Sequence, residues 1–186
     1  MSGIRIVAGE WRGHRLAVPK GASVRPTSER VREAVFDVLG PVTGHRVLDL
    51  FAGSGALGLE ALSRGASHAT FVEVDAHVAA VLEKNISSVR YGERTRVMRC
   101  EYGQALTRLA AAGSSFDLLF VDPPYRILEQ VMGVLDPCLP GLLEADGLAV
   151  IEGPPGGKVH AAGEVLFSRR YGNTVVTMIA KGTRYR

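Results

Sequence analysis

The fold is decided by one stretch, Val47-Leu48-Asp49-Leu50-Phe51-Ala52-Gly53-Ser54-Gly55, which continues into Ala56-Leu57-Gly58. An apolar strand, a glycine-rich turn and the start of a helix follow one another here, and nucleotide-binding α/β folds begin in this way. Gly53 and Gly55 permit positive φ angles and a close approach of the backbone to a ligand. The spacing Gly53-x-Gly55-x-x-Gly58 also satisfies the dinucleotide fingerprint, a weak pattern that admits NAD or FAD.

Strand and helix patterns alternate around this stretch. Apolar runs predict strands at 45–50, 69–74, 95–100, 116–121 and 146–152, and the segments 56–64, 75–88, 102–112 and 127–137 predict helices. Residues 163–170 and 173–181 flank a turn around Tyr171-Gly172-Asn173 and predict an antiparallel hairpin. The rhythm predicts an α/β protein with a Rossmann-like, doubly wound, mostly parallel sheet of seven strands and helices on both faces.

The first forty residues have a different pattern. Residues 3–8 and 13–18 alternate loosely around Gly9-Glu10-Trp11-Arg12-Gly13, which predicts a β-hairpin. Thr27 or Ser28 can cap a helix that Pro41 stops, with an apolar stripe of Val31, Ala34, Val35, Val38 and Leu39. We expect residues 1–40 to form an N-terminal hairpin–helix extension and residues 41–186 to form the main domain.

A second informative segment is Asp122-Pro123-Pro124-Tyr125, which follows the apolar run 116–121. Open α/β sheets place ligands at the carboxyl ends of their strands. The two prolines make a stiff turn with free carbonyls, between a carboxylate and an aromatic ring. Such a set suits a flat base with an exocyclic amino group, because the oxygens can accept the amino hydrogens and the ring can stack. The alternative is an ordinary turn with Tyr125 as a packing residue.

Two acidic residues follow the second strand of the main domain. Glu73 lies 18 residues after Gly55, where a carboxylate can accept both ribose hydroxyls of an adenosine. Asp75 is predicted mainly to cap the next helix, and the alternative for Glu73 is an exposed strand end.

Composition and charge restrict the class of protein. Hydrophobic residues make up 46% of the 186 residues, no run approaches a membrane span, and the N-terminus lacks the apolar core of a signal peptide. The two cysteines and five histidines show no metal-ligand spacing, so we expect a cytoplasmic protein without a metal site. Residues 1–40 are net +3 and residues 167–186 net +5, whereas the middle is net −5. Basic ends predict a polyanionic partner, or else charges that only solvate the termini.

Together these residues resemble a known family. The glycine loop from Val47 to Gly55, then Glu73, then the Asp122–Tyr125 segment are similar to class I S-adenosylmethionine-dependent N-methyltransferases. The stretches 6–13, 25–27, 30–36 and 171–174 resemble the bacterial family that methylates the N2 amino group of guanine 966 in 16S rRNA. The likeness runs nearly end to end.

The resemblance implies S-adenosylmethionine as cofactor. Its methionine end would be held by Asp49 and the loop Phe51, Ala52, Gly53, Ser54 and Gly55, and its ribose by Glu73, which Val74 follows. Glu101 and Tyr102 would border the adenine, although many relatives have Asn or Asp and a small residue there. Residues near Thr27 and Arg30 would close over the cofactor. Asp122 and a Pro123 carbonyl would hold the target amino group, and Tyr125 would stack on the base beside Pro124.

The resemblance also implies 16S rRNA as the partner, with a preference for an assembled small subunit over naked RNA. We expect the protein to be a monomer. We expect RNA contacts from Arg5, Trp11, Arg12, Arg15, Arg25, Arg30, Arg32, Arg169, Arg170, Lys181 and Arg184, mainly in the extension. Trp11 is equally well interpreted as a packing anchor of the hairpin.

Three other functions stay open on the sequence alone. One is an oxidoreductase that uses the Gly53–Gly58 fingerprint, although no substrate domain follows it. The second is an amino-methyltransferase for DNA adenine or protein glutamine, and the third is a nucleotide-binding module without catalysis.

Overall fold

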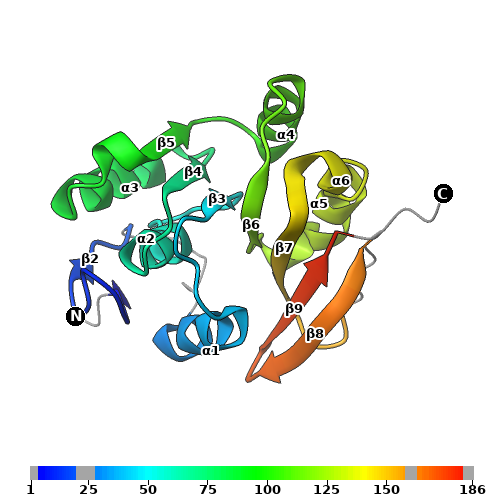
Figure 1. The fold of residues 1–186 in the computed structure, drawn as a ribbon, viewed down its shortest axis with the longest axis horizontal. Helices are drawn as coiled ribbons and strands as arrows, with labels where there is room; N and C mark the ends of the chain where they lie inside the picture. Colours follow the sequence, from blue (N-terminus) through cyan, green and yellow to red (C-terminus); the bar gives the residue numbers. More distant parts are fainter. Residues whose placement is uncertain (1–3, 20–27, 158–162, 182–186) are drawn as a thin grey trace.

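A computed structural model describes residues 4–19, 28–157 and 163–181, and its central feature is a seven-stranded sheet (Figure 1). The strands are β3 (Arg46–Asp49), β4 (His68–Val72), β5 (Thr95–Met98), β6 (Phe116–Val121), β7 (Leu143–Gly153), β8 (Glu164–Tyr171) and β9 (Thr174–Ala180). Their order is β5-β4-β3-β6-β7-β9-β8. The first five pair in parallel, and β9 and β8 add an antiparallel hairpin. The predicted Rossmann-like fold is confirmed.

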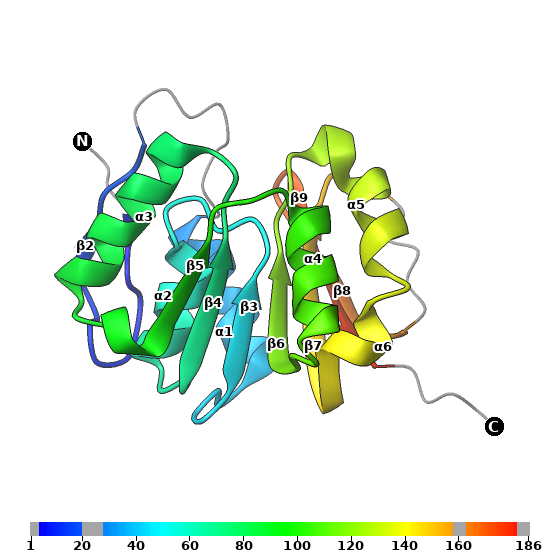
Figure 2. The ribbon, with the colours of Figure 1, turned by 90° about the horizontal axis from the view of Figure 1, so that it is seen from above.

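Helices cover both faces of this sheet (Figure 2). Buried side chains of α1 (Glu29–Leu39), α2 (Ala56–Ser63) and α3 (Ala76–Ser88) form one core against the sheet. Those of α4 (Tyr102–Ala111), α5 (Leu128–Leu135) and α6 (Leu139–Leu142) form the second core on the opposite face. Strands buried on both faces read as continuous apolar runs, which is why the pattern identified them.

The structure corrects the predicted elements in a few places. The segment α6 and two short 3-10 helices, Gly92–Arg94 and Tyr125–Ile127, have no counterpart in the prediction. The predicted stripe of α1 is wrong at Val38, which is 44% exposed. Phe36 takes the buried position and packs against Phe120, with ring centroids 5.7 Å apart. Ser28 caps this helix by accepting a hydrogen bond from the Val31 amide.

The N-terminal hairpin shares the core of the main domain. Its strands β1 (Ile4–Arg5) and β2 (Arg15–Leu16) pair antiparallel, and Ile4 and Leu16 are buried in the same cluster as α2. The turn between them docks on α2, where the buried Glu60 carboxylate accepts from the amides of Val7 (2.7 Å) and Ala8 (3.0 Å). The hairpin is therefore a structural part of the α2 face as well as a candidate RNA-binding extension.

Two further observations concern the class of protein. In the three described ranges, no helix is both long enough and apolar enough to cross a membrane. Cys100 is buried, Cys138 is partly buried, and both are free thiols.

Candidate active site

Three carboxyl groups meet at one edge of the sheet. Asp49 is the last residue of β3, Glu73 follows β4, and Asp122 follows β6. These strands are neighbours and run parallel, so their carboxyl ends lie at the same edge. The chain leaves β3 for β4 on one side and later returns to β6 on the other, and open α/β sheets bind ligands at such a point.

Asp49 is the most deeply buried of the three. Its side chain is 2% exposed, and its Oδ2 accepts a hydrogen bond from the Gly58 amide at 3.1 Å. Burial raises the pKa of Asp49 to about 7, and the charges of Asp122 and Glu73 add to this effect, whereas the Gly58 hydrogen bond opposes it. A carboxyl group in this state favours a cationic partner, because a nearby positive charge would restore its ionised form.

The glycine loop is held in place by close packing and by hydrogen bonds. Gly55 has a φ of +83° and precedes α2, and a Cβ atom there would lie 2.4 Å from the Leu82 side chain. Glu73 holds the loop from the side, because its carboxylate accepts from the Gly53 amide (3.0 Å) and from the Asp75 amide (2.9 Å). Asp75 caps α3 through the His77 and Val78 amides, as predicted.

A small pocket of about 40 Å³ opens beside this loop. Val74 is 58% exposed at its rim, and the rings of Phe51 and Tyr102 stand 5.4 Å apart. Predicted cofactor residues from three segments thus surround one space, lined by Leu50, Phe51, Val72, Glu73, Val74, Cys100, Glu101 and Tyr102. Ala52 and Ser54 are nearly buried in the loop itself, and Thr27 lies outside the described residues.

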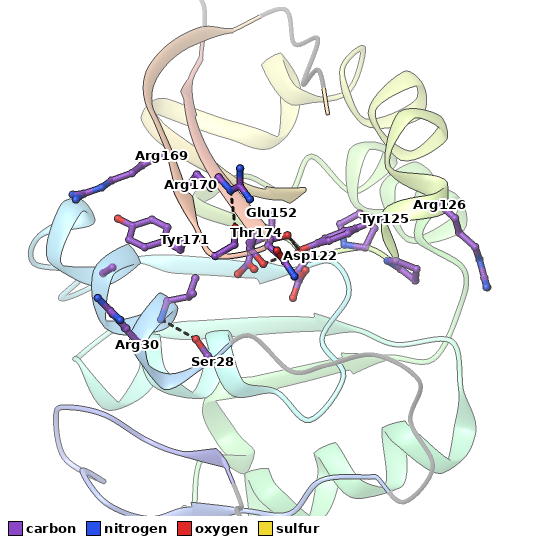
Figure 3. Close-up of a pocket in the computed structure, with 16 residues that line it drawn as sticks. Ser28, Arg30, Asp122, Tyr125, Arg126, Glu152, Arg169, Arg170, Tyr171 and Thr174 are labelled. Carbon is purple, nitrogen blue, oxygen red and sulfur yellow. Dashed lines mark hydrogen bonds between the residues drawn. The ribbon is translucent and has the colours of Figure 1, made fainter. Parts of the chain in front are cut away.

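A much larger cleft, of about 960 Å³, contains the Asp122–Tyr125 segment (Figure 3). The start of α1 forms one wall through Ser28, Arg30, Val31 and Ala34. The β8–β9 hairpin contributes the segment 169–174, and Glu152 lies beside Asp122. The cleft is therefore assembled from four segments that are distant in the sequence.

Tyr125 is fixed by the terminal hairpin. Its hydroxyl lies 2.7 Å from the Thr174 hydroxyl, while 40% of the residue is exposed. Partial burial raises the pKa of Tyr125, the charges of Asp122 and Glu152 add to the rise, and the Thr174 hydrogen bond opposes it. The ring is thus held at the cleft with area left for a ligand.

Four exposed arginines surround this cleft: Arg30, Arg126, Arg169 and Arg170. Three of them were predicted RNA contacts, and Arg126 was not.

The other predicted RNA contacts lie elsewhere. The exposed Arg5, Arg12 and Arg15 of the N-terminal hairpin do not line the cleft. Arg5 pairs with Glu29 at 3.2 Å, and the Lys181 ammonium donates to the Leu143 carbonyl at 2.7 Å. Arg25 and Arg184 lie outside the described residues.

Two predicted RNA contacts need revision. Arg32 is 1% exposed and donates to the Arg5 carbonyl at 2.5 Å, so the prediction that it contacts RNA is wrong. It lies on α1 next to Val31 of the expected apolar stripe, and it is buried against the N-terminal hairpin. For Trp11 the contacts favour the packing alternative, because the ring packs against the core and stands edge-on to His14 and Tyr91.

Several residues at the site were not predicted from the sequence. Glu152 is 3% exposed and follows the apolar run 148–151, just as Asp122 follows 116–121. This similarity between the two strand ends could have indicated Glu152. The sequence did not indicate Arg126 or Tyr171, because their place at the cleft depends on tertiary packing. Within the described part of the chain, no group of three or more His, Cys, Asp or Glu residues could hold a metal ion.

Comparison with known proteins gives a consistent result. Residues 4–180 match the family described as Conserved hypothetical protein 95. The Escherichia coli protein named Ribosomal RNA small subunit methyltransferase D is 46% identical over 136 residues, 72% of this chain and 67% of that protein. Its namesake in Haemophilus influenzae is 36% identical over 152 residues, 80% and 78% of the two chains. A solved structure described as "Putative methyltransferase yhhF from Escherichia coli" is 35% identical, with a TM-score of 0.84 and coverage of 98% and 100%.

Proposed function

Because this chain belongs to the Conserved hypothetical protein 95 family and is similar to proteins named as ribosomal RNA methyltransferases, we propose that it methylates the N2 amino group of a guanine in 16S rRNA. Its methyl donor is S-adenosylmethionine, and its target is guanine 966 in the conventional rRNA numbering. One observation carries the proposal. The segment Asp122-Pro123-Pro124-Tyr125 lines a large cleft, and this segment lies at the same edge of the sheet as Asp49 and Glu73.

Asp49 at the end of β3 and the residues of the neighbouring smaller pocket fit this cofactor. Buried Asp49, with its raised pKa, suits the ammonium group of the methionine end. Glu73 retains acceptor capacity for the ribose hydroxyls beyond its two amide hydrogen bonds, because a carboxylate has about four acceptor positions. The exposed apolar face of Val74 and the Phe51–Tyr102 pair suit the adenine. When bound, S-adenosylmethionine supplies a methyl group that its sulfonium already activates for displacement.

The chain's own contribution is to hold and polarise the amino group of the base. The Asp122 carboxylate and the Pro123 carbonyl accept the two N2 hydrogens, which fixes the nitrogen in line with the methyl group. The same hydrogen bonds offset the positive charge that develops on this nitrogen, and Asp122 can then take the proton. The ring of Tyr125 stacks on a guanine that has left its helix.

RNA is held around the target cleft. Arg30, Arg126, Arg169 and Arg170 surround the cleft and can contact phosphates on either side of a flipped guanine. The hairpin arginines Arg12 and Arg15 would contact more distant RNA. We propose that the partner is 16S rRNA within an assembled small subunit, and that the enzyme acts as a monomer in the cytoplasm, where these subunits form.

Mapping of the modified base tests this function. Small subunits and naked 16S rRNA from cells lacking the protein are incubated with purified enzyme and labelled cofactor, and the label is located by nuclease digestion and mass spectrometry. We expect N2-methylguanine at position 966, preferentially in the particle. D122A should abolish transfer, and D146A, at an exposed site on β7, should not. Label only on DNA adenine or protein glutamine would contradict the proposal.

A further inference from the structure

The target cleft contains a buried acid that the proposed mechanism does not use. Glu152 lies near the carboxyl end of β7 and is 3% exposed, yet it lines the cleft. Charged side chains are almost never so buried unless they are paired. Figure 3 shows it close to Asp122.

Strand geometry places Glu152 next to Asp122. Val121, the last residue of β6, pairs with Ile151 of β7, so Asp122 just after β6 and Glu152 on β7 are the next residues along the two parallel chain segments. Side chains alternate along a strand, and Phe120 and Val150 both pack in the core on the α1 side. Asp122 and Glu152 share their parity, so both carboxylates are directed towards the α1 wall of the cleft.

Two neighbouring carboxylates match one edge of guanine. On the Watson–Crick edge of guanine, the N1–H and N2–H₂ groups are adjacent donors. Asp122 is assigned to the amino group, which leaves N1–H beside it without an acceptor. We propose that the Glu152 carboxylate accepts the N1–H hydrogen and thereby selects guanine as the target base. This inference rests on the proposed function and adds a specificity-determining residue to it.

The assignment explains how an amino-methylating site avoids other bases. Adenine has an unprotonated N1 in the corresponding position, and a carboxylate facing that lone pair would be repelled. The Asp122 segment alone is compatible with several amino groups, as the alternatives from the sequence show. A site built to hydrogen-bond one donor rejects analogues that lack it far more strongly than an apolar pocket does.

A structural role for Glu152 makes a different prediction. Arg32 is buried in α1, and the Glu152 charge is among those that counter the lowering of the Arg32 pKa by burial. A carboxylate has about four acceptor positions, so a partner in the protein leaves capacity for a base. If Glu152 only balanced Arg32, its loss would affect folding and leave base preference unchanged.

The test compares two bases at the target position. Splint-ligated 16S rRNA carrying guanine or 2-aminopurine at the target is reconstituted into small subunits. 2-Aminopurine keeps the N2 amino group, but its N1 is an acceptor. We expect wild-type kcat/KM to be roughly 100-fold lower for 2-aminopurine. In E152Q, the neutral amide oxygen is a weaker acceptor for the guanine N1–H than the carboxylate, so kcat/KM for guanine should fall roughly 10- to 100-fold. The amide N–H can donate to N1 of 2-aminopurine, so the preference for guanine should shrink at least tenfold.

Each outcome is informative because the preference is a ratio within one protein preparation, which cancels the fraction that is folded. E129Q, at an exposed position on α5, should keep both the rate and the ratio. An unchanged preference in E152Q would overturn the inference, even if its activity or melting temperature falls. A wild-type enzyme that fails on the guanine particle would instead contradict the proposed function.

Discussion

At the scale of single residues, the proposed role of Asp49 predicts a pH dependence of cofactor binding. Its pKa is about 7 in the free protein, so the carboxyl is largely protonated below pH 7 and must lose that proton to pair with an ammonium. We expect the affinity for S-adenosylmethionine to fall up to about tenfold per pH unit as pH decreases below 7, one proton being linked to binding. Calorimetry from pH 8 to pH 5.5 measures this.

The control is a ligand without the charged end. Methylthioadenosine has the adenine and ribose but no ammonium, so its affinity should be independent of pH over the same range. D49N should bind S-adenosylmethionine weakly at every pH. A flat profile for the wild-type protein would move Asp49 out of the cofactor site.

The same residue affects stability with a defined sign. The folded state favours the protonated form of a carboxyl whose pKa there lies above its usual value of 3.8. The free energy of unfolding therefore decreases as pH rises from about 4 to about 7. D49N has no such loss. We expect the free energy of unfolding of wild type, relative to D49N, to decrease across this range in urea titrations and to level off above pH 7.

The Tyr125 hydroxyl has a specific role in the structure. Stacking alone predicts that Y125F is nearly harmless and that Y125A loses about 1–3 kcal/mol. The 2.7 Å contact with Thr174 adds an orienting hydrogen bond, worth about 0.5–1.5 kcal/mol. We expect Y125F and T174V each to lower kcat/KM by a few-fold, and the double variant to lose no more than either single one. Additive losses would show that the two hydroxyls act separately.

At the scale of elements, the docking of the hairpin on α2 can be tested with two glycines. Gly9 and Gly13 have the same φ of +84°, but a Cβ on Gly9 would lie 1.8 Å from the Ser63 carbonyl oxygen, whereas one on Gly13 would meet nothing within 4 Å. We expect G13A to cost about 1 kcal/mol of stability through backbone strain. G9A should cost about 3 kcal/mol or more, because it also forces the turn off the helix. Equal losses of stability in denaturant titrations would mean that the turn is not packed against α2.

The hairpin is also connected to the glycine loop through Asn85. Asn85 on α3 is 3% exposed, and its amide donates to the Ser54 carbonyl (2.8 Å) and to the Ala17 carbonyl (3.0 Å). N85A leaves these groups without partners, at a cost of about 1–3 kcal/mol, and should weaken cofactor binding. S87A, at an exposed site on α3, is the control. Consequently, deleting residues 1–20 should also weaken cofactor binding, contrary to a simple division between an RNA-binding extension and a cofactor domain.

How much the sequence could predict depended on the range of the interactions. The strands and main helices were predictable because burial on two faces makes apolar runs, and the Asp49, Glu73 and Asp122 edge follows from parallel topology. Arg32 and Val38 were misplaced, because the helical stripe alone does not say which residue at its border faces the sheet. The roles of Glu60 and Asn85 were not predicted, because Val7, which donates to Glu60, and Ala17, which donates to Asn85, lie 53 and 68 residues away in the sequence.

At the scale of the whole molecule, the arrangement of basic residues predicts where RNA lies. The cleft arginines Arg30, Arg126, Arg169 and Arg170 come from α1, the segment after β6 and the terminal hairpin. Replacing each by alanine should reduce the log–log dependence of RNA affinity on salt by about 0.7–0.9 and lower turnover. R12A and R15A, at exposed positions of the N-terminal hairpin that do not line the cleft, should change affinity less and leave base placement intact. If instead only the hairpin variants change the slope, RNA approaches from the N-terminal side.

The contact between Tyr125 and the β8–β9 turn has a consequence for the order in which the protein acquires its activities during synthesis. A ribosome delivers the chain from its N-terminus. Every proposed cofactor contact is present once residue 102 has emerged, but the wall that holds Tyr125 arrives only with Asn173 and Thr174, more than 70 residues later. A nascent chain that has not yet reached these residues, or a chain terminated before them, therefore lacks one wall of the proposed base-binding cleft, and we expect methyl transfer only after they have emerged.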